Sequence, residues 1–166
     1  MRPLSVLLLN PSNPNSQRRA TDLRAAAAVI GREILIVQAS HSDELERAFK
    51  TAIEQRIGAL IIQNDIVFVS ERDRIVSLAS RYHIPTIYET REHVVAGGLL
   101  SYGANISERF RLLGQYTGKI LQGHKPADLP VIQPTKFDLV INLRAARTLG
   151  IDVPPLLLAR ADEVIE

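Results

Sequence analysis

The 166-residue sequence contains no cysteine and no tryptophan, and only four phenylalanines and four tyrosines. Without cysteine there are no disulfides, no cysteine-ligated zinc sites and no thiol catalysis. Few aromatic side chains, a formal net charge of only +2 and no basic cluster beyond Arg18–Arg19 argue against a nucleic-acid partner. With 46% hydrophobic and 23% charged residues, the chain has the composition of a single globular domain.

Long apolar runs are also missing. No stretch reaches the roughly 20 apolar residues that a membrane-spanning helix needs. The apolar run from Ser5 to Leu9 is cut off by Asn10–Pro11, whereas a secretory signal has a longer apolar core and a small-residue cleavage site. We therefore interpret this run as a β-strand and expect no export signal in these residues.

Short apolar runs alternate with amphipathic stretches over the first 96 residues. Solid apolar runs are typical of strands buried on both faces, and they predict strands at residues 5–9, 33–37, 59–62 and 84–88. Three- and four-residue apolar spacing predicts helices at residues 16–30, 42–53 and 70–82. Strands that alternate with helices indicate right-handed crossovers. The predicted fold class is α/β, with a doubly wound parallel sheet.

Local signals refine two of these helices. In the first, we expect a buried stripe of Leu23, Ala26, Ala27 and Ile30, followed by Gly31 in the left-handed conformation that ends many helices. In the second, Ser42 has the residue type of an N-cap and is followed by two acidic residues.

Residues 97–166 are less regular. We expect strands at Leu99–Gly103 and Phe137–Ile141, and a long helix at Ser107–Leu121. Asn142 is a suitable N-cap for a short helix, and Pro154–Pro155 suits the start of a last helical turn. The apolar residues of the long helix cover a wide arc rather than one stripe, which is typical of a helix covered on more than one side.

Ligands of open parallel sheets bind beyond the carboxyl ends of the strands. The loop after the first predicted strand contains Asn10, Ser12, Asn13 and Asn15, and it opens onto a helix N-terminus that favours an anion such as a carboxylate. These side chains either cap the helix and shape a proline turn, or contact a ligand. Asp65, after the third predicted strand, either receives an ammonium or hydroxyl group or bonds its own backbone.

Several motifs with known chemistry are missing. The sequence has no GxGxxG, Walker A or GxSxG pattern. Strand one ends in Asn10–Pro11 rather than in the paired acids of a phospho-receiver domain, so that class is excluded as well. The four histidines are scattered, and we expect them at the surface or in turns rather than at a metal. We therefore predict no metal, no cofactor, no catalytic residues and no enzymatic activity.

Four stretches have a distinctive sequence: residues 87–103 (IYETREHVVAGGLLSYG), 123–131 (GHKPADLPV), 133–142 (QPTKFDLVIN) and 154–165 (PPLLLARADEVI). They resemble ABC transporter substrate-binding proteins of the tryptophan/tyrosine type. Departures are small, with Thr90 and His93 standing where aromatic residues are usual. The resemblance covers essentially the whole chain.

The resemblance implies one lobe of a two-lobed, type I periplasmic binding protein fold. This sequence looks like the second lobe, residues 1–166, with a core of residues 1–103 and 135–166. Leu99–Gly103 is then a crossover segment, and the helix-loop segment 104–134 normally belongs to the first lobe. Without that lobe the apolar residues of the long helix lack their usual neighbour. We therefore predict a homodimer in which this segment packs against, or is exchanged with, a second copy.

The implied function is capture of a small, amino-acid-like and possibly aromatic ligand for delivery to an ABC permease. Carried over by position, Asn10, Ser12, Asn13 and Asn15 line the polar end of the ligand, Asp65 takes its ammonium group and Tyr102 comes from the crossover. Asn13 stands where some members have an acid. The resemblance implies a periplasmic or extracytoplasmic location, and the expected lack of an export signal leaves a cytoplasmic dimeric small-molecule sensor as the alternative.

Overall fold

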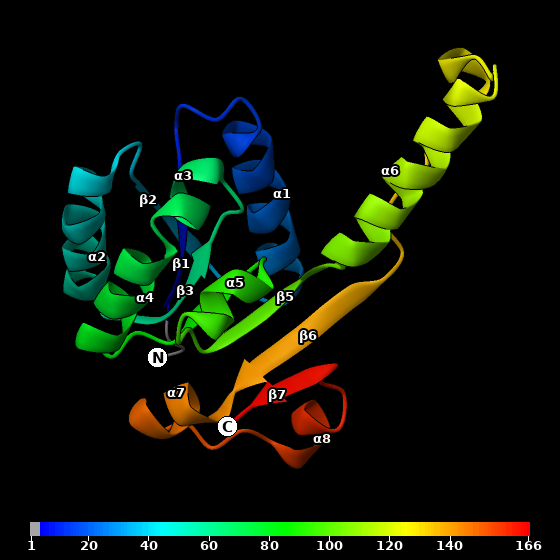
Figure 1. Cartoon of the computed structure of the whole chain (residues 1–166). Helices are drawn as coiled ribbons and strands as arrows, with labels where there is room; N and C mark the ends of the chain where they lie inside the picture. Colours follow the sequence, from blue (N-terminus) through cyan, green and yellow to red (C-terminus); the bar gives the residue numbers. More distant parts are fainter. Residues whose placement is uncertain (1–3) are drawn as a thin grey trace.

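The computed structural model describes residues 4–166 and contains one seven-stranded sheet in the order β2-β1-β3-β4-β5-β6-β7 (Figure 1). Residues 1–3 of the predicted lobe lie outside the described part. The strands are β1 (Leu4–Leu9), β2 (Ile34–Gln38), β3 (Ile57–Ile62), β4 (Thr86–Tyr88), β5 (Leu100–Ala104), β6 (Phe137–Asn142) and β7 (Glu163–Ile165). The predicted α/β class and the strands of the first half are confirmed.

The helices are α1 (Ser16–Val29), α2 (Leu45–Glu54), α3 (Ile66–Ser70), α4 (Arg72–Arg81), α5 (Arg91–Val95), α6 (Ile106–Leu121), α7 (Leu143–Thr148) and α8 (Pro155–Leu158). Two short 3₁₀ turns lie at Ser42–Glu44 and Pro126–Asp128. Among the residues from 4 to 166, no helix has the length and apolar composition needed to cross a bilayer.

The alternation of side chains along β1 builds two apolar layers. Val6 and Leu8 point into the main core, which α2 and α4 complete with residues such as Phe49 and Ile75. Leu7 and Leu9 point to the opposite face, where Ala20 of α1 packs on them. Helices therefore cover both faces, as predicted for a doubly wound sheet.

The sheet is not parallel throughout, which corrects the prediction. β5 and β6 pair antiparallel, with Tyr102 opposite Leu139, while the other neighbouring strands pair parallel. The reason is the path of the chain. It leaves the sheet along β5, passes through α6 and returns along β6, so these two strands run in opposite directions.

The buried stripe of α1 differs from the predicted one. Ile30 is 67% exposed and Ala26 is exposed, whereas the helix buries Ser16, Ala20 and Ala27. The polar Ser16 is drawn inward because its hydroxyl donates to the backbone oxygen of Asn10. Gly31, with φ of +64°, has the predicted left-handed conformation.

Other local predictions fail for identifiable reasons. Ser42 does not cap α2 but begins the 3₁₀ turn, and its hydroxyl donates to Glu71 over 2.6 Å. The helix predicted at residues 70–82 is confirmed as α4, and the separate short helix α3 that precedes it was not predicted. His93 is buried rather than at the surface, because Thr90 and the backbone oxygen of Phe68 engage its two ring nitrogens over 2.8 and 3.1 Å. Asn142 caps α7 as predicted, accepting from Ala145 N over 3.0 Å.

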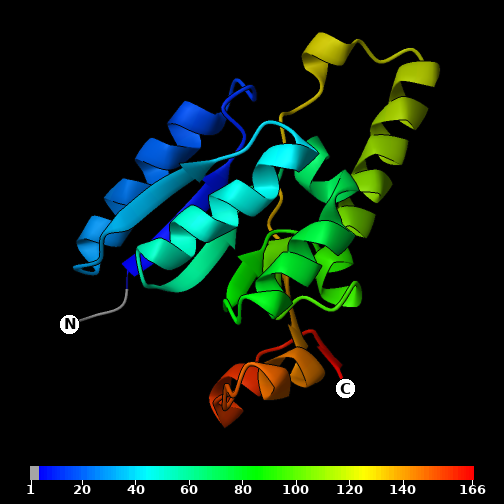
Figure 2. The ribbon, with the colours of Figure 1, turned by 90° about the vertical axis from the view of Figure 1, so that its left-hand side faces the viewer.

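α6 extends away from the sheet and buries none of its residues (Figures 1 and 2). Asn105 caps its start, accepting from the backbone N–H of Glu108 over 2.7 Å. The returning chain runs beside it, where Tyr116 donates to the backbone oxygen of Pro130 over 2.6 Å. The apolar arc expected to be covered is exposed along the helix, at Ile106, Phe110, Leu113, Ile120 and Leu121.

Gly103 is required where β5 leaves the sheet. A Cβ atom at this position would overlap the carbonyl oxygen of Glu89, at the end of β4. We expect Gly103→Ala to lower the free energy of unfolding by about 1–3 kcal/mol, the usual cost of overpacking. Urea denaturation measures this cost.

Gly114→Ala is the matched control, because Gly114 lies inside α6 with nothing within 4 Å of an added Cβ. Alanine there should be neutral or stabilise by up to about 1 kcal/mol, since glycine is a poor helix former. Equal urea midpoints for the two variants would contradict the close approach of Gly103 to the backbone of Glu89.

Candidate functional site

The predicted polar residues gather where parallel strands end. β1 runs into Asn10, β3 into Gln63 and Asp65, and β4 into Glu89. β1 lies between β2 and β3, and the helices after β1 and β3 pack on opposite faces of the sheet. This is the position where the winding of an open α/β sheet reverses and where such sheets bind ligands.

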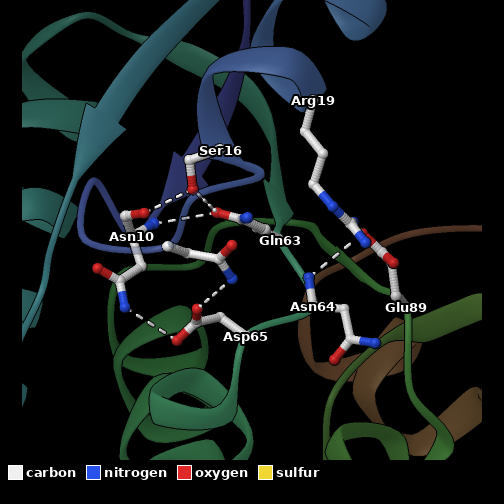
Figure 3. A network of polar contacts seen from close by, with 8 residues as sticks. Asn10, Ser16, Arg19, Gln63, Asn64, Asp65 and Glu89 are labelled. Atoms are coloured by element: carbon white, nitrogen blue, oxygen red, sulfur yellow. Dashed lines mark hydrogen bonds and ion pairs between the residues drawn. The ribbon is translucent and has the colours of Figure 1, made fainter.

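Asp65 is the centre of a hydrogen-bond network (Figure 3). The side-chain amides of Asn10 and Asn13 donate to its two oxygens over 3.0 and 2.7 Å. The backbone N–H of Val67 donates over 2.9 Å, so Asp65 also caps α3. Asp65 is only 5% exposed. The structure thus brings the predicted first loop and the predicted acid into direct contact.

The pKa of Asp65 lies below its ordinary value. Burial acts to raise the pKa, but hydrogen bonds from the amides of Asn13 and Asn10 and from the backbone of Val67 and Phe68 outweigh burial. These donors are all uncharged. The buried carboxylate therefore stays ionised at neutral pH and leaves a negative charge at this edge of the sheet.

The first loop is held by its own asparagine side chains. Asn10 Oδ1 accepts from the backbone N–H of Ser12, and Asn13 Oδ1 accepts from that of Asn15, each over 2.9 Å. Asn15 occupies the N-cap position of α1, but its side chain makes no capping bond. Of the two structural roles expected for these side chains, the structure shows that they shape the turn and that Asn15 does not cap α1.

One residue of this network, Gln63, was not singled out by sequence reasoning. Gln63 is 2% exposed, and its Oε1 accepts from Asn10 N over 3.0 Å and lies 3.0 Å from Ser16 Oγ. Within the described residues the Nε2 of Gln63 has no partner. The signal that could have found Gln63 is a large polar residue at the end of an apolar strand.

Tyr102 lies in a groove of about 650 Å³ beside this network, away from the other predicted residues. The groove is lined by the loop after β4, the start of α5, β5, the start of α6, and residues of β6 and β7. Tyr102 is 57% exposed and stacks on Phe137, with ring centroids 5.6 Å apart. Asn64, next to Asp65, lines the same groove, so the two groups of predicted residues are neighbours.

An ion pair that the sequence did not suggest stands beside the groove (Figure 3). Arg19 of α1 donates to Glu89 Oε1 over 2.6 Å, and the backbone N–H of Asn64 donates to the same oxygen over 3.2 Å. Glu89 falls in the loop after β4, which the topology rule marks as a candidate, but nothing in the sequence indicates Arg19 as its partner. In residues 4–166, no cluster of three His, Cys, Asp or Glu side chains is placed to hold a metal.

Comparison with known families matches residues 5–165 to the family described as ABC transporter substrate binding protein. No curated protein matches the chain. Among solved structures, the chain is 26% identical to a conserved domain protein from Vibrio cholerae O1 biovar eltor, with a TM-score of 0.88, covering 96% of this chain and 54% of that one.

Two further solved structures are similar. An ABC domain in complex with L-Trp from Streptococcus pneumoniae is 25% identical, with a TM-score of 0.87, covering 98% of this chain and 57% of that one. A ligand-free, open substrate-binding protein with adhesive properties from Clostridium difficile shares the fold at 22% identity and a TM-score of 0.72, covering 99% and 55%. The chain therefore spans about half the length of these proteins.

Asp65→Asn is expected to destabilise the fold at neutral pH. It places an amide donor against the donating amides of Asn10 and Asn13, and losing a charged acceptor of this kind costs about 2–3 kcal/mol. Thermal unfolding should show this loss, while Asp152→Asn, at an exposed carboxylate, should leave the melting temperature unchanged.

The loss of stability caused by Asp65→Asn should depend on pH. Because folding lowers the pKa of Asp65, its contribution is fully present above the unfolded-state pKa of about 3.9 and is lost as pH falls through the lower folded-state pKa. The difference in melting temperature between wild type and Asp65→Asn should therefore narrow below about pH 4. A difference that stays constant down to pH 2.5 would contradict this assignment.

Proposed function

The chain belongs to the family of ABC transporter substrate-binding proteins, and from this membership we propose that it is one lobe of a solute-binding protein that captures a small, amino-acid-like ligand. The family is one of binding proteins rather than enzymes. The observation that carries the proposal is the groove at the carboxyl edge of the sheet, where charged side chains and an exposed aromatic pair line one cavity of about 650 Å³.

The ligand site has a polar wall and an aromatic surface. Charged side chains that line the groove, among them Arg19 and Glu89, form the wall. Asn10, Ser12, Asn13, Asn15 and Asp65 lie beside the groove, and their mutual hydrogen bonds hold the adjoining loop in place before any ligand arrives. Tyr102, stacked on Phe137, offers its exposed ring to a flat apolar side chain. The L-Trp complex of the Streptococcus pneumoniae relative supports an aromatic amino acid as the ligand.

The bound ligand is then delivered to an ABC permease on the outer side of the membrane. In two-lobed binding proteins, closure of both lobes over the ligand excludes water and raises affinity. One lobe supplies only part of these contacts. We therefore expect weak, millimolar-range binding by the 166-residue chain alone.

Segment 104–134, which contains α6, forms an arm distinct from the core of residues 1–103 and 135–166. Phe110, Leu113 and Leu121 are exposed on this arm, and covering each large apolar side chain stabilises by roughly 1.5–3 kcal/mol. When the 166-residue chain is isolated, we propose that the arm packs against a second copy, by contact or by exchange, to form a homodimer.

Ligand binding can be tested by the shift in melting temperature. L-Trp, L-Tyr and L-Phe at millimolar concentration should raise the melting temperature by mass action, by the equivalent of about 0.4 kcal/mol where the ligand concentration equals a millimolar Kd. Tyr102→Ala should remove the shift, whereas Tyr116→Ala, on α6 outside the groove, should keep it. No shift with any amino acid would refute the proposed function.

The oligomeric state can be tested by light scattering. At tens of micromolar, wild type should have twice the 18.4 kDa mass of the monomer. The double variant Phe110→Glu, Leu113→Glu should be monomeric, because it places charges on the apolar face of α6. Val29→Glu, at an even more exposed apolar residue of α1, should remain dimeric. A monomeric wild type would contradict the dimer.

A further inference from the structure

Two ion pairs line the groove, and they differ in how many of their atoms are engaged. Arg91 donates through Nε and Nη2 to both oxygens of Glu163, each over 2.6 Å, which is a saturated bidentate pair. Arg19 instead contacts Glu89 through Nη1 and Oε1 alone. Among the described residues, no hydrogen bond engages Oε2 of Glu89 or the Nε and Nη2 groups of Arg19.

The Arg19–Glu89 pair is also accessible from two sides. It borders the groove of about 650 Å³ and an apolar hollow of about 320 Å³ beside α1, lined by Leu23 and Ile61 among others. The Arg19 and Glu89 side chains are 42% and 37% exposed. A ligand in either cavity therefore reaches unsatisfied donors and acceptors of opposite charge.

Asp65 is placed differently. Its oxygens already accept from three groups of the chain, and only 5% of the residue is exposed. Its negative charge acts at this edge of the sheet, but its atoms are occupied in holding the first loop. Arg19 and Glu89 keep free hydrogen-bonding capacity and hold opposite charges side by side. Glu92 and Arg109 also line the groove, but neither forms an ion pair among the described residues.

We propose that Arg19 and Glu89 bind the two charged groups of a free α-amino acid, a role that deepens the proposed function and rests on it. The planar guanidinium presents Nε and Nη2 to the ligand carboxylate, and Glu89 Oε2 accepts from the ligand ammonium. Asp65 is a positioning residue that acts through the loop it holds. The site then selects zwitterions over ligands that carry only one of the two charges.

The ligand half of the test uses three indole compounds that differ only in charged groups. The 166-residue chain, labelled with nitrogen-15, is titrated with L-tryptophan, tryptamine and indole-3-propionate, and amide shifts give each Kd. The last two should bind at least tenfold more weakly, because each lacks one charge-assisted contact. Equal affinity for all three would overturn the proposal.

The protein half separates ligand contact from a structural ion pair. Arg19→Gln and Glu89→Gln should each weaken L-tryptophan binding about 10- to 100-fold, whereas Arg18→Gln, in an exposed pair with Asp22 on the same helix, should not. The swap Arg19→Glu, Glu89→Arg rebuilds the ion pair with reversed polarity. Binding should stay weak in the swap although its amide spectrum shows a folded chain.

The outcomes distinguish failure of the Arg19–Glu89 assignment from failure of the proposed amino-acid-binding function. If wild type binds L-tryptophan and the swap restores full affinity, the pair is structural and this inference is wrong while the proposed function stands. Unchanged affinity in both glutamine variants leads to the same conclusion. If wild type binds none of the amino acids, the proposed function itself fails and this inference fails with it.

Discussion

The buried carboxylate of Asp65 organises the edge of the sheet on which the candidate site is built. A buried charge is costly unless hydrogen bonds satisfy it, and here neutral amides from the loop after β1 and from the start of α3 do so. The same contacts fix the loop against β3. Because Asp65 and the asparagines satisfy one another, the open pair of opposite charges beside the groove is that of Arg19 and Glu89.

A second constraint is the stem formed by β5 and β6. Gly103 lies so close to the backbone of Glu89 that no side chain fits, and this contact joins the stem to the end of β4. The stem carries α6 away from the sheet with its apolar face exposed. The arm and the groove therefore share one structural element, since Tyr102 on β5 lines the groove and Ile106 begins α6.

The elements that sequence reasoning predicted are those with a strong local signal. β1 to β4 are apolar because both faces are covered, and α6 is long enough to show periodicity. α3, α5 and β7 were missed because segments of three to five residues show no period. The first loop and Asp65 were singled out because they follow strand ends, and the structure brings them into contact. The Arg19–Glu89 pair was not, since it joins residues 70 positions apart.

The sequence by itself determined the α/β class, the family and the edge of the sheet on which a site belongs, because burial and period are encoded locally. Only the tertiary structure decided that β5 and β6 run antiparallel, that Asp65 is occupied within the chain and that Arg19 meets Glu89. These outcomes depend on how distant strand ends and helices are placed against one another. No local pattern records that placement, since each partner alone is an ordinary polar residue at the end of an element.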